Sequence, residues 1–145
     1  LLHDIGRRFG VTQLAHVING YDYLMKLGFY EPARISLTHS FAVKDIHTYI
    51  GIPDVSEEDC QRISDLIASF DYDDYDRLIQ LCDSIAMAEG PTDMVTRMSD
   101  VKNRYGFYPQ KKWDKHLELQ KYFEDKMGKS LNEVLSCQTS NHQTQ

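Results

Sequence analysis

Cysteine is scarce in this 145-residue sequence, and its positions form no framework. Cys60, Cys82 and Cys137 are odd in number, and none belongs to a CxxC pair or to another short metal-binding or redox spacing. Disulfide-stapled secreted domains carry more cysteines than this in a short chain. We therefore expect a reducing compartment, and with it a cytoplasmic location.

Long apolar runs and an excess of basic residues are also missing. No segment approaches the roughly 18 apolar residues of a membrane-spanning helix, and no charged stretch followed by an apolar one marks a targeting signal. The 22 acidic residues outnumber the 16 basic ones, so the formal charge is −6. General nucleic-acid binders and membrane-surface proteins need a net basic face. We therefore expect neither nucleic acid nor membrane as a partner, and only a local basic pocket remains possible.

Strand patterns of convincing length and internal repeats are absent, whereas helical spacing of apolar residues runs through most of the chain. Ser56 with an acidic residue three positions later is a capping-box pattern. With 41% hydrophobic residues, the length suits one domain with its own core. The expected fold is an all-α bundle, a single domain over residues 1–137 with a disordered polar tail over 138–145. The spacing predicts helices over residues 11–27, 33–41, 43–51, 56–70, 74–89, 91–105 and 111–127, and a short one that opens at 130.

Five polar side chains occupy positions where this pattern expects a core: His3, Asp4, His16, His39 and Asp83. A buried Asp83 would need a cation or a hydrogen-bond donor beside it, although a helix can also turn this residue to solvent. His16 taken alone is more often a core histidine than a ligand. As a set, however, imidazoles and carboxylates from several helices are typical of metal sites in helical bundles. Nitrogen ligands with two carboxylates favour Mn, Fe, Co, Ni or Zn over Ca.

The opening stretch LLHDIGR resembles the HDIG form of the HD-domain superfamily. Its members are all-α metal-dependent phosphohydrolases with the ligand pattern H…HD…D, and two-metal members have further histidines before the last Asp. On this resemblance His3 and Asp4 match the HD pair, His16 and His39 the intermediate histidines, and Asp83 the closing Asp. The likeness covers residues 1 to 88. The family's first His stands upstream of the HD pair, so we expect a domain that lacks its first helix.

The resemblance implies phosphoester hydrolysis with one or two divalent transition-metal ions. Asp4 would bridge two ions, with His3 and Asp83 on one and the intermediate histidines on the other. A bound ion lowers the pKa of water from ~15.7 toward ~7 and so makes hydroxide available at neutral pH. The 13 positions from His3 to His16 are fewer than we expect in the cyclic-dinucleotide phosphodiesterase branch. That branch is therefore a poor guide to the substrate.

Cationic side chains are the candidates for binding the phosphoryl oxygens. Arg7 stands one turn after His3, where i and i+4 share a helix face, and Asp4 with Arg7 is the expected catalytic pair. Lys44 and Arg104 are further substrate-binding candidates, and each is equally a solvated cation on an amphipathic helix. The remaining histidines have no place in the pattern and are expected at the surface: His47, His116 and His142.

Three functional hypotheses follow. The first is a metal-dependent phosphohydrolase for a small phosphorylated compound or nucleotide. The second is a degenerate HD domain that binds a nucleotide or protein partner without catalysis, and the third is a structural helical module with core histidines. Metal content separates the third from the others, and turnover separates the first from the second. No feature of the sequence indicates an oligomeric state.

Overall fold

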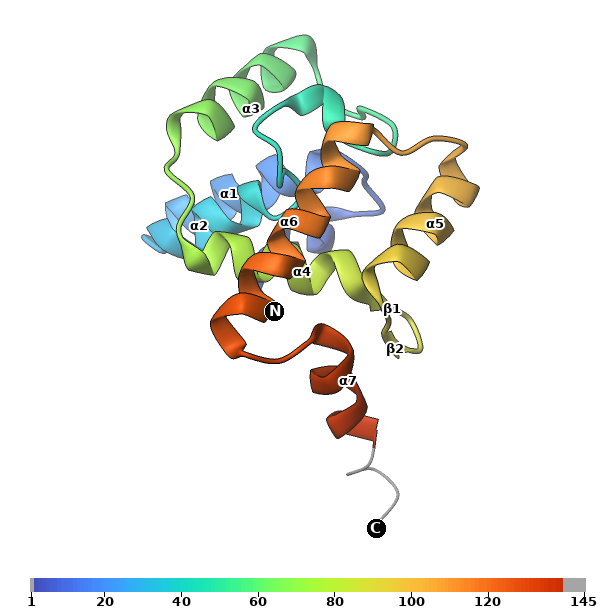
Figure 1. Cartoon of the computed structure of the whole chain (residues 1–145). Coiled ribbons are helices and arrows are strands. Elements are labelled where there is room, and N and C mark those ends of the chain that lie inside the picture. The colour runs from blue at the N-terminus through green and yellow to red at the C-terminus, as the bar shows by residue number, and fades with distance from the viewer. Residues whose placement is uncertain (1, 140–145) are drawn as a thin grey trace. The chain divides into compact units, whose positions relative to one another are not determined.

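The computed structural model describes residues 2–139, and in that part of the chain the secondary structure is almost entirely helical (Figure 1). The expected all-α class is thereby confirmed. The elements in chain order are the 3-10 helix η1 (Leu2–Phe9), α1 (Ala15–Lys26), α2 (Tyr30–Thr38), the 3-10 helix η2 (Ile46–Thr48), α3 (Glu57–Ser69), α4 (Asp74–Ile85), β1 (Ala86–Met87), β2 (Gly90–Pro91), α5 (Met94–Tyr105), α6 (Gln110–Met127) and α7 (Leu131–Thr139).

The chain forms two compact units, residues 1–80 and 81–145, and α4 runs through the boundary. In the first unit, η1 packs against α1 and α2, which also pack against each other. Burying apolar side chains is the main favourable contribution to folding. The fully buried core of this unit consists of Leu14, Val17, Ile18, Leu37, Phe41, Ile63 and Ile67.

Helix α1 begins at Ala15, four residues later than the apolar spacing predicted. A distant side chain binds backbone N–H groups at the start of this helix: Asp54 Oδ1 accepts from Ala15 N at 2.8 Å, and Asp54 Oδ2 accepts from Gln13 N, just before the helix, at 2.7 Å. Burial acts to raise the pKa of Asp54, but these backbone donors outweigh it and hold the pKa below its ordinary value. The start of α1 is thus set by a residue 39 positions further along the chain.

Two other helix boundaries follow local rules. Ser56 Oγ accepts from Asp59 N at 3.0 Å at the start of α3, which confirms the predicted capping pattern. The helix expected over residues 74–89 ends earlier, at Ile85, because the next residues form a two-stranded antiparallel pairing of β1 with β2.

The second unit has its own core, built from α4, α5, α6 and α7, with Leu81, Ile85, Met94, Met98, Phe123 and Leu131 buried. The surface position expected for His116 is wrong, because its side chain is buried and the Tyr108 hydroxyl lies 2.7 Å from its Nδ1. The expected tail over 138–145 belongs to α7 as far as Thr139, and residues 140–145 lie outside the described part.

Candidate metal centre

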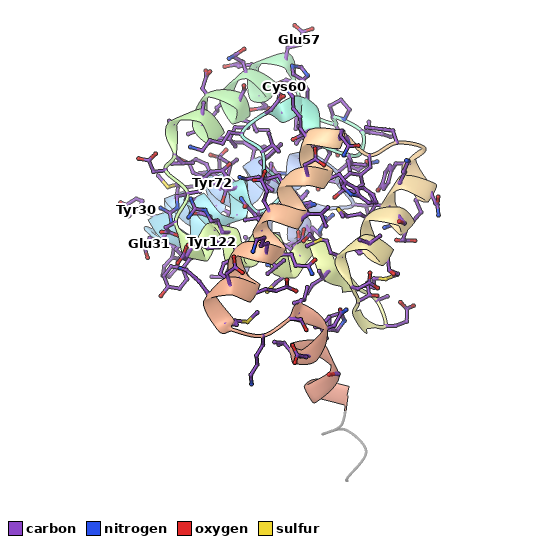
Figure 2. All side chains as sticks on the ribbon, in the orientation of Figure 1. Tyr30, Glu31, Glu57, Cys60, Tyr72 and Tyr122 are labelled. Carbon is purple, nitrogen blue, oxygen red and sulfur yellow. The ribbon has the colours of Figure 1, made fainter. Side chains whose placement is uncertain are left out.

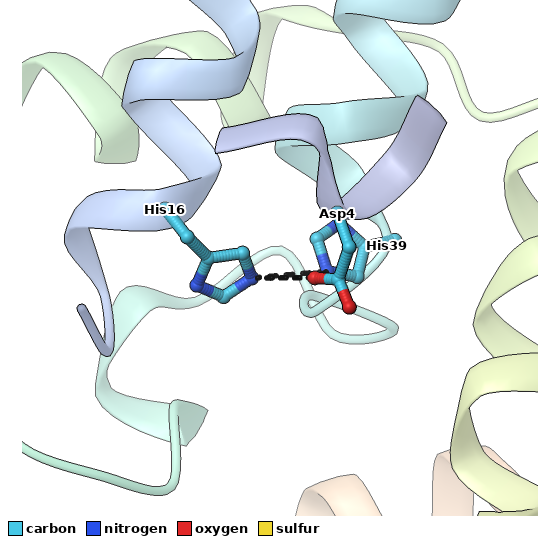
Figure 3. Close-up of side chains that lie close together, drawn as sticks. All are labelled: Asp4, His16 and His39. Atoms are coloured by element: carbon cyan, nitrogen blue, oxygen red, sulfur yellow. Dashed lines mark hydrogen bonds and ion pairs between the residues drawn. The ribbon is translucent and has the colours of Figure 1, made fainter. Parts of the chain in front are cut away.

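Three ligand atoms from separate segments of the first unit converge, as Figure 3 shows. Asp4 lies on η1, His16 on α1 and His39 directly after α2, and their ligand atoms all lie within 4.8 Å of one another. The two Nε2 atoms are 3.2 Å apart, and Asp4 Oδ1 lies 3.4 Å from that of His16 and 3.6 Å from that of His39. Both imidazoles are buried, whereas the carboxylate is partly exposed.

The crossing of η1 over α1 depends on the glycine of the HDIG motif. A Cβ at Gly6 would lie 1.9 Å from the carbonyl oxygen of His16 and 2.7 Å from the nitrogen of Gly20. Gly20 must also be small, because its Cβ would meet Ser36 Oγ at 2.2 Å. That hydroxyl in turn donates to a backbone carbonyl of η1 at 3.0 Å. Backbone packing therefore holds η1 against α1 and α2. It thereby positions Asp4 beside His16, on α1, and His39, directly after α2.

Backbone carbonyls set the tautomer of both histidines. His16 Nδ1 donates to the carbonyl oxygen of Gln13, and His39 Nδ1 donates to that of Ser36 at 2.8 Å. A carbonyl oxygen only accepts, so each Nδ1 carries the hydrogen and each neutral ring presents a lone pair at Nε2. Metal-binding histidines in proteins show this same support of the second ring nitrogen.

The electrostatics of the site suit a cation. Burial, followed by the charges of His16 and His3, lowers the pKa of His39 to about 3, so this ring is neutral at pH 7. Burial acts to raise the pKa of Asp4, but its interactions with His39 and Arg7, and then with His16 and His3, bring that pKa below its ordinary value. Two imidazole lone pairs and an ionised carboxylate oxygen repel one another unless a proton or a metal ion lies among them. The group of Asp4, His16 and His39 can therefore hold a metal ion.

His3 and Arg7 lie next to this group. His3 Nε2 is 3.8 Å from Asp4 Oδ2, and its ring packs edge-on against His39 with 5.0 Å between ring centroids. Arg7 Nε donates to Asp4 Oδ1 at 3.0 Å, and its NH1 donates to the carbonyl of Thr12 at 3.3 Å. Arg7 thus contacts the carboxylate itself, a contact that sequence reasoning had not assigned to it.

The other predicted site residues lie elsewhere. Asp83, on α4, belongs to the second unit. There, burial lowers the pKa of Lys112 to about 8, and the charge of Asp83 partly offsets this lowering. Lys44 donates to the carbonyl oxygen of Phe70. Arg104 is in the second unit and pairs with Asp100 at 2.9 Å. The roles of Asp83, Lys44 and Arg104 in metal or substrate binding stay predictions.

Sequence reasoning missed the residues that support the ligands. Gln13 and Ser36 act through backbone carbonyls, and a carbonyl is common to every residue type, so no side-chain signal marks them. Gly6 did carry a signal, because a glycine two positions after a ligand on a helical segment points to a close backbone approach.

No protein-family model, no curated protein and no solved structure matches this chain. The family resemblance thus rests on the LLHDIGR motif and the order of His16, His39 and Asp83 in the sequence. Within the described residues, no helix combines the length and apolar character needed to span a membrane.

Proposed function

We propose that this chain is a metal-dependent phosphohydrolase of the HD type that acts on a small phosphorylated compound or a nucleotide. The observation that carries the proposal is the convergence of Asp4, His16 and His39 from three segments, with both histidines supported as metal ligands are. The donor set of two imidazoles and a carboxylate suits Mn, Fe, Co, Ni or Zn. A divalent ion in this position supplies Lewis acidity toward a phosphoryl oxygen and activates water.

The chain's own residues have distinct roles in this proposal. Asp4 stays ionised at neutral pH and His39 stays neutral, so both are in the protonation state that metal binding needs. Arg7 is half-exposed beside Asp4, so its guanidinium can orient the carboxylate and also meet the oxygens of a phosphoryl group. His3, at the edge of the group, is the next available ligand.

The test begins with metal content. The purified chain is reconstituted separately with Mn, Fe, Co, Ni and Zn, dialysed and measured by elemental analysis, alongside His16→Gln and His39→Gln. We expect metal in the parent and its loss in both variants, because two of the three ligands are imidazoles. His47→Gln is the matched control for metal content, since His47 is exposed and lies outside the group. Full metal occupancy in His16→Gln and His39→Gln would refute the site.

Turnover is measured next with p-nitrophenyl phosphate and a panel of nucleotides. Release of phosphate that depends on the bound metal supports the hydrolase. Metal binding with no turnover of any phosphoester would instead favour the degenerate HD domain, which binds a nucleotide or partner without catalysis. A parent chain that takes up none of the five metals leaves the structural helical module as the better description.

A further inference from the structure

A separate cavity lies in the first unit, between the start of α1, the segment around η2 and the first turn of α3. Its volume is about 300 Å³. Leu14, Ile46, Tyr49 and Pro53 form apolar walls, and Cys60 lines it from α3, on whose first turn Figure 2 shows this residue. None of the ligand atoms of the metal centre belongs to its lining.

The lining holds no carboxylate, ammonium or guanidinium group. An ionic ligand such as a phosphate would lose its hydration there without a counter-charge, so the cavity disfavours it. The size suits a small ring system, since a cavity of about 150 Å³ already accepts benzene. Tyr49 and His47 bring aromatic rings to the lining, and an aromatic ring packs well against another flat ring.

The walls are held in place before any ligand arrives. Gln13 Oε1 accepts from the Ile52 N–H at 2.6 Å, and Asp54 caps α1, so the loop over residues 49–54 is tied at two points. Gly51 has φ +141° and its Cβ would lie 3.0 Å from Tyr49 Cε1, so only glycine lets the loop pass this close to the aromatic ring. A preformed cavity spares a ligand the cost of ordering it.

The cavity also has polar groups that can orient a ligand. The backbone N–H of His47 donates to Asp45 Oδ1 at 3.0 Å. Its imidazole ring makes no hydrogen bond to any of the described residues. An exposed imidazole can donate to or accept from a ring nitrogen or carbonyl at the cavity mouth. The thiol of Cys60 is a weaker second group on the α3 side.

We propose that this cavity is a binding site for a small uncharged planar molecule of one or two fused rings, distinct from the metal centre. The loop that forms its wall also carries Asp54 and contacts Gln13, whose carbonyl supports His16. A ligand in the cavity therefore packs against a loop that is hydrogen-bonded to Gln13, the residue whose carbonyl contacts His16. The binding itself needs no metal, so its test is independent of the proposed hydrolase.

Cys60 serves as a reporter in the unaltered chain, with the exposed Cys82 as an internal control. N-ethylmaleimide alkylation is followed at each cysteine by peptide mass spectrometry, with and without indole or adenine as probes. At a probe concentration about four times its Kd, we expect alkylation of Cys60 to slow about fivefold, because only the unoccupied fraction reacts. The rate at Cys82 should not change. Equal rates at Cys60 with and without both probes, up to their solubility limits, would overturn the proposal.

A matched pair of variants locates the bound probe. Cys60→Phe fills the cavity, and Cys82→Phe makes the same change at an exposed position outside it. Saturation transfer from protein to indole in NMR should be lost in Cys60→Phe and kept in Cys82→Phe, with helix content checked by circular dichroism. Transfer that persists in a folded Cys60→Phe would place indole elsewhere and refute the site. If Cys60→Phe does not fold, the alkylation result on the parent chain decides.

Discussion

The substitution Gly6→Ala tests how the fold builds the candidate metal centre. The added Cβ would lie 1.9 Å from the carbonyl oxygen of His16, where carbon and oxygen normally approach to about 3.5 Å. Because the obstacle is the backbone of α1, η1 has to move by about 1 Å or more. That shift carries Asp4, two positions earlier on η1, away from both histidines. In the parent chain, Asp4 Oδ1 lies 3.4 Å from His16 Nε2 and 3.6 Å from His39 Nε2.

Two measurable effects follow from the displaced helix. Overpacking should reduce the free energy of unfolding by about 1 to 3 kcal/mol, measured by urea titration. Loss of ligand positioning should weaken Mn(II) binding by about 10- to 100-fold, measured by calorimetric titration of the folded protein. The metal effect is the diagnostic one, because it reports on the geometry of the site.

Gly28→Ala is the control for simple destabilisation. Gly28 has φ +78° at the end of α1, and a Cβ there meets no atom within 4 Å. A left-handed alanine costs about 1 to 2 kcal/mol, comparable with the Gly6 variant, but η1 is left undisturbed. We expect parent-like Mn(II) affinity in Gly28→Ala. If Gly6→Ala also binds Mn(II) with parent affinity, the crossing of η1 does not position Asp4; equal losses in both variants would assign the effect to lowered stability.

Three further predictions concern other substitutions. Asp4→Ala should abolish metal binding, whereas Arg7→Ala should retain it and lower phosphoester turnover by about 10²-fold or more; equal metal content in Asp4→Ala and the parent would contradict this assignment. Asp54→Ala removes both hydrogen bonds that this side chain accepts at the start of α1, and should lower the free energy of unfolding in urea by about 1 to 2 kcal/mol; an unchanged midpoint would show that water replaces them. Burial, then the charge of Lys112, lowers the pKa of His116 from 6.5 to about 3. On acidification, His116 is therefore protonated at a higher pH in the unfolded chain than in the folded one. Its contribution to stability is complete above pH 6.5 and should fall by about 2 kcal/mol between pH 7 and pH 5; His116→Gln should remove that part of the pH dependence, and identical pH profiles would count against it.

The predicted surface position of His116 failed for an identifiable reason. His116 stands three positions before Leu119 and seven before Phe123, so all three share one face of α6. That face is buried in the second unit, and Tyr108 supplies a hydrogen-bond partner for the ring. The helical spacing places His116 on the apolar face, although the metal-ligand pattern gives it no place.

The sequence by itself determined what depends on neighbours within a helical turn. Apolar spacing predicted the helical class, and the Ser56 pattern predicted the start of α3, because those interactions span three or four residues. The residue types of the candidate metal centre were also readable, since Asp4, His16 and His39 have the chemistry of metal ligands whatever their surroundings.

Only the tertiary structure decided which of these groups meet. His16 and His39 are 23 positions apart, and α1 begins where it does because Asp54 reaches it from 39 positions away. The approach of η1 to α1 depends on the absence of a side chain at Gly6. Contacts of this kind form only when distant segments pack, and local propensity carries no information about their partners.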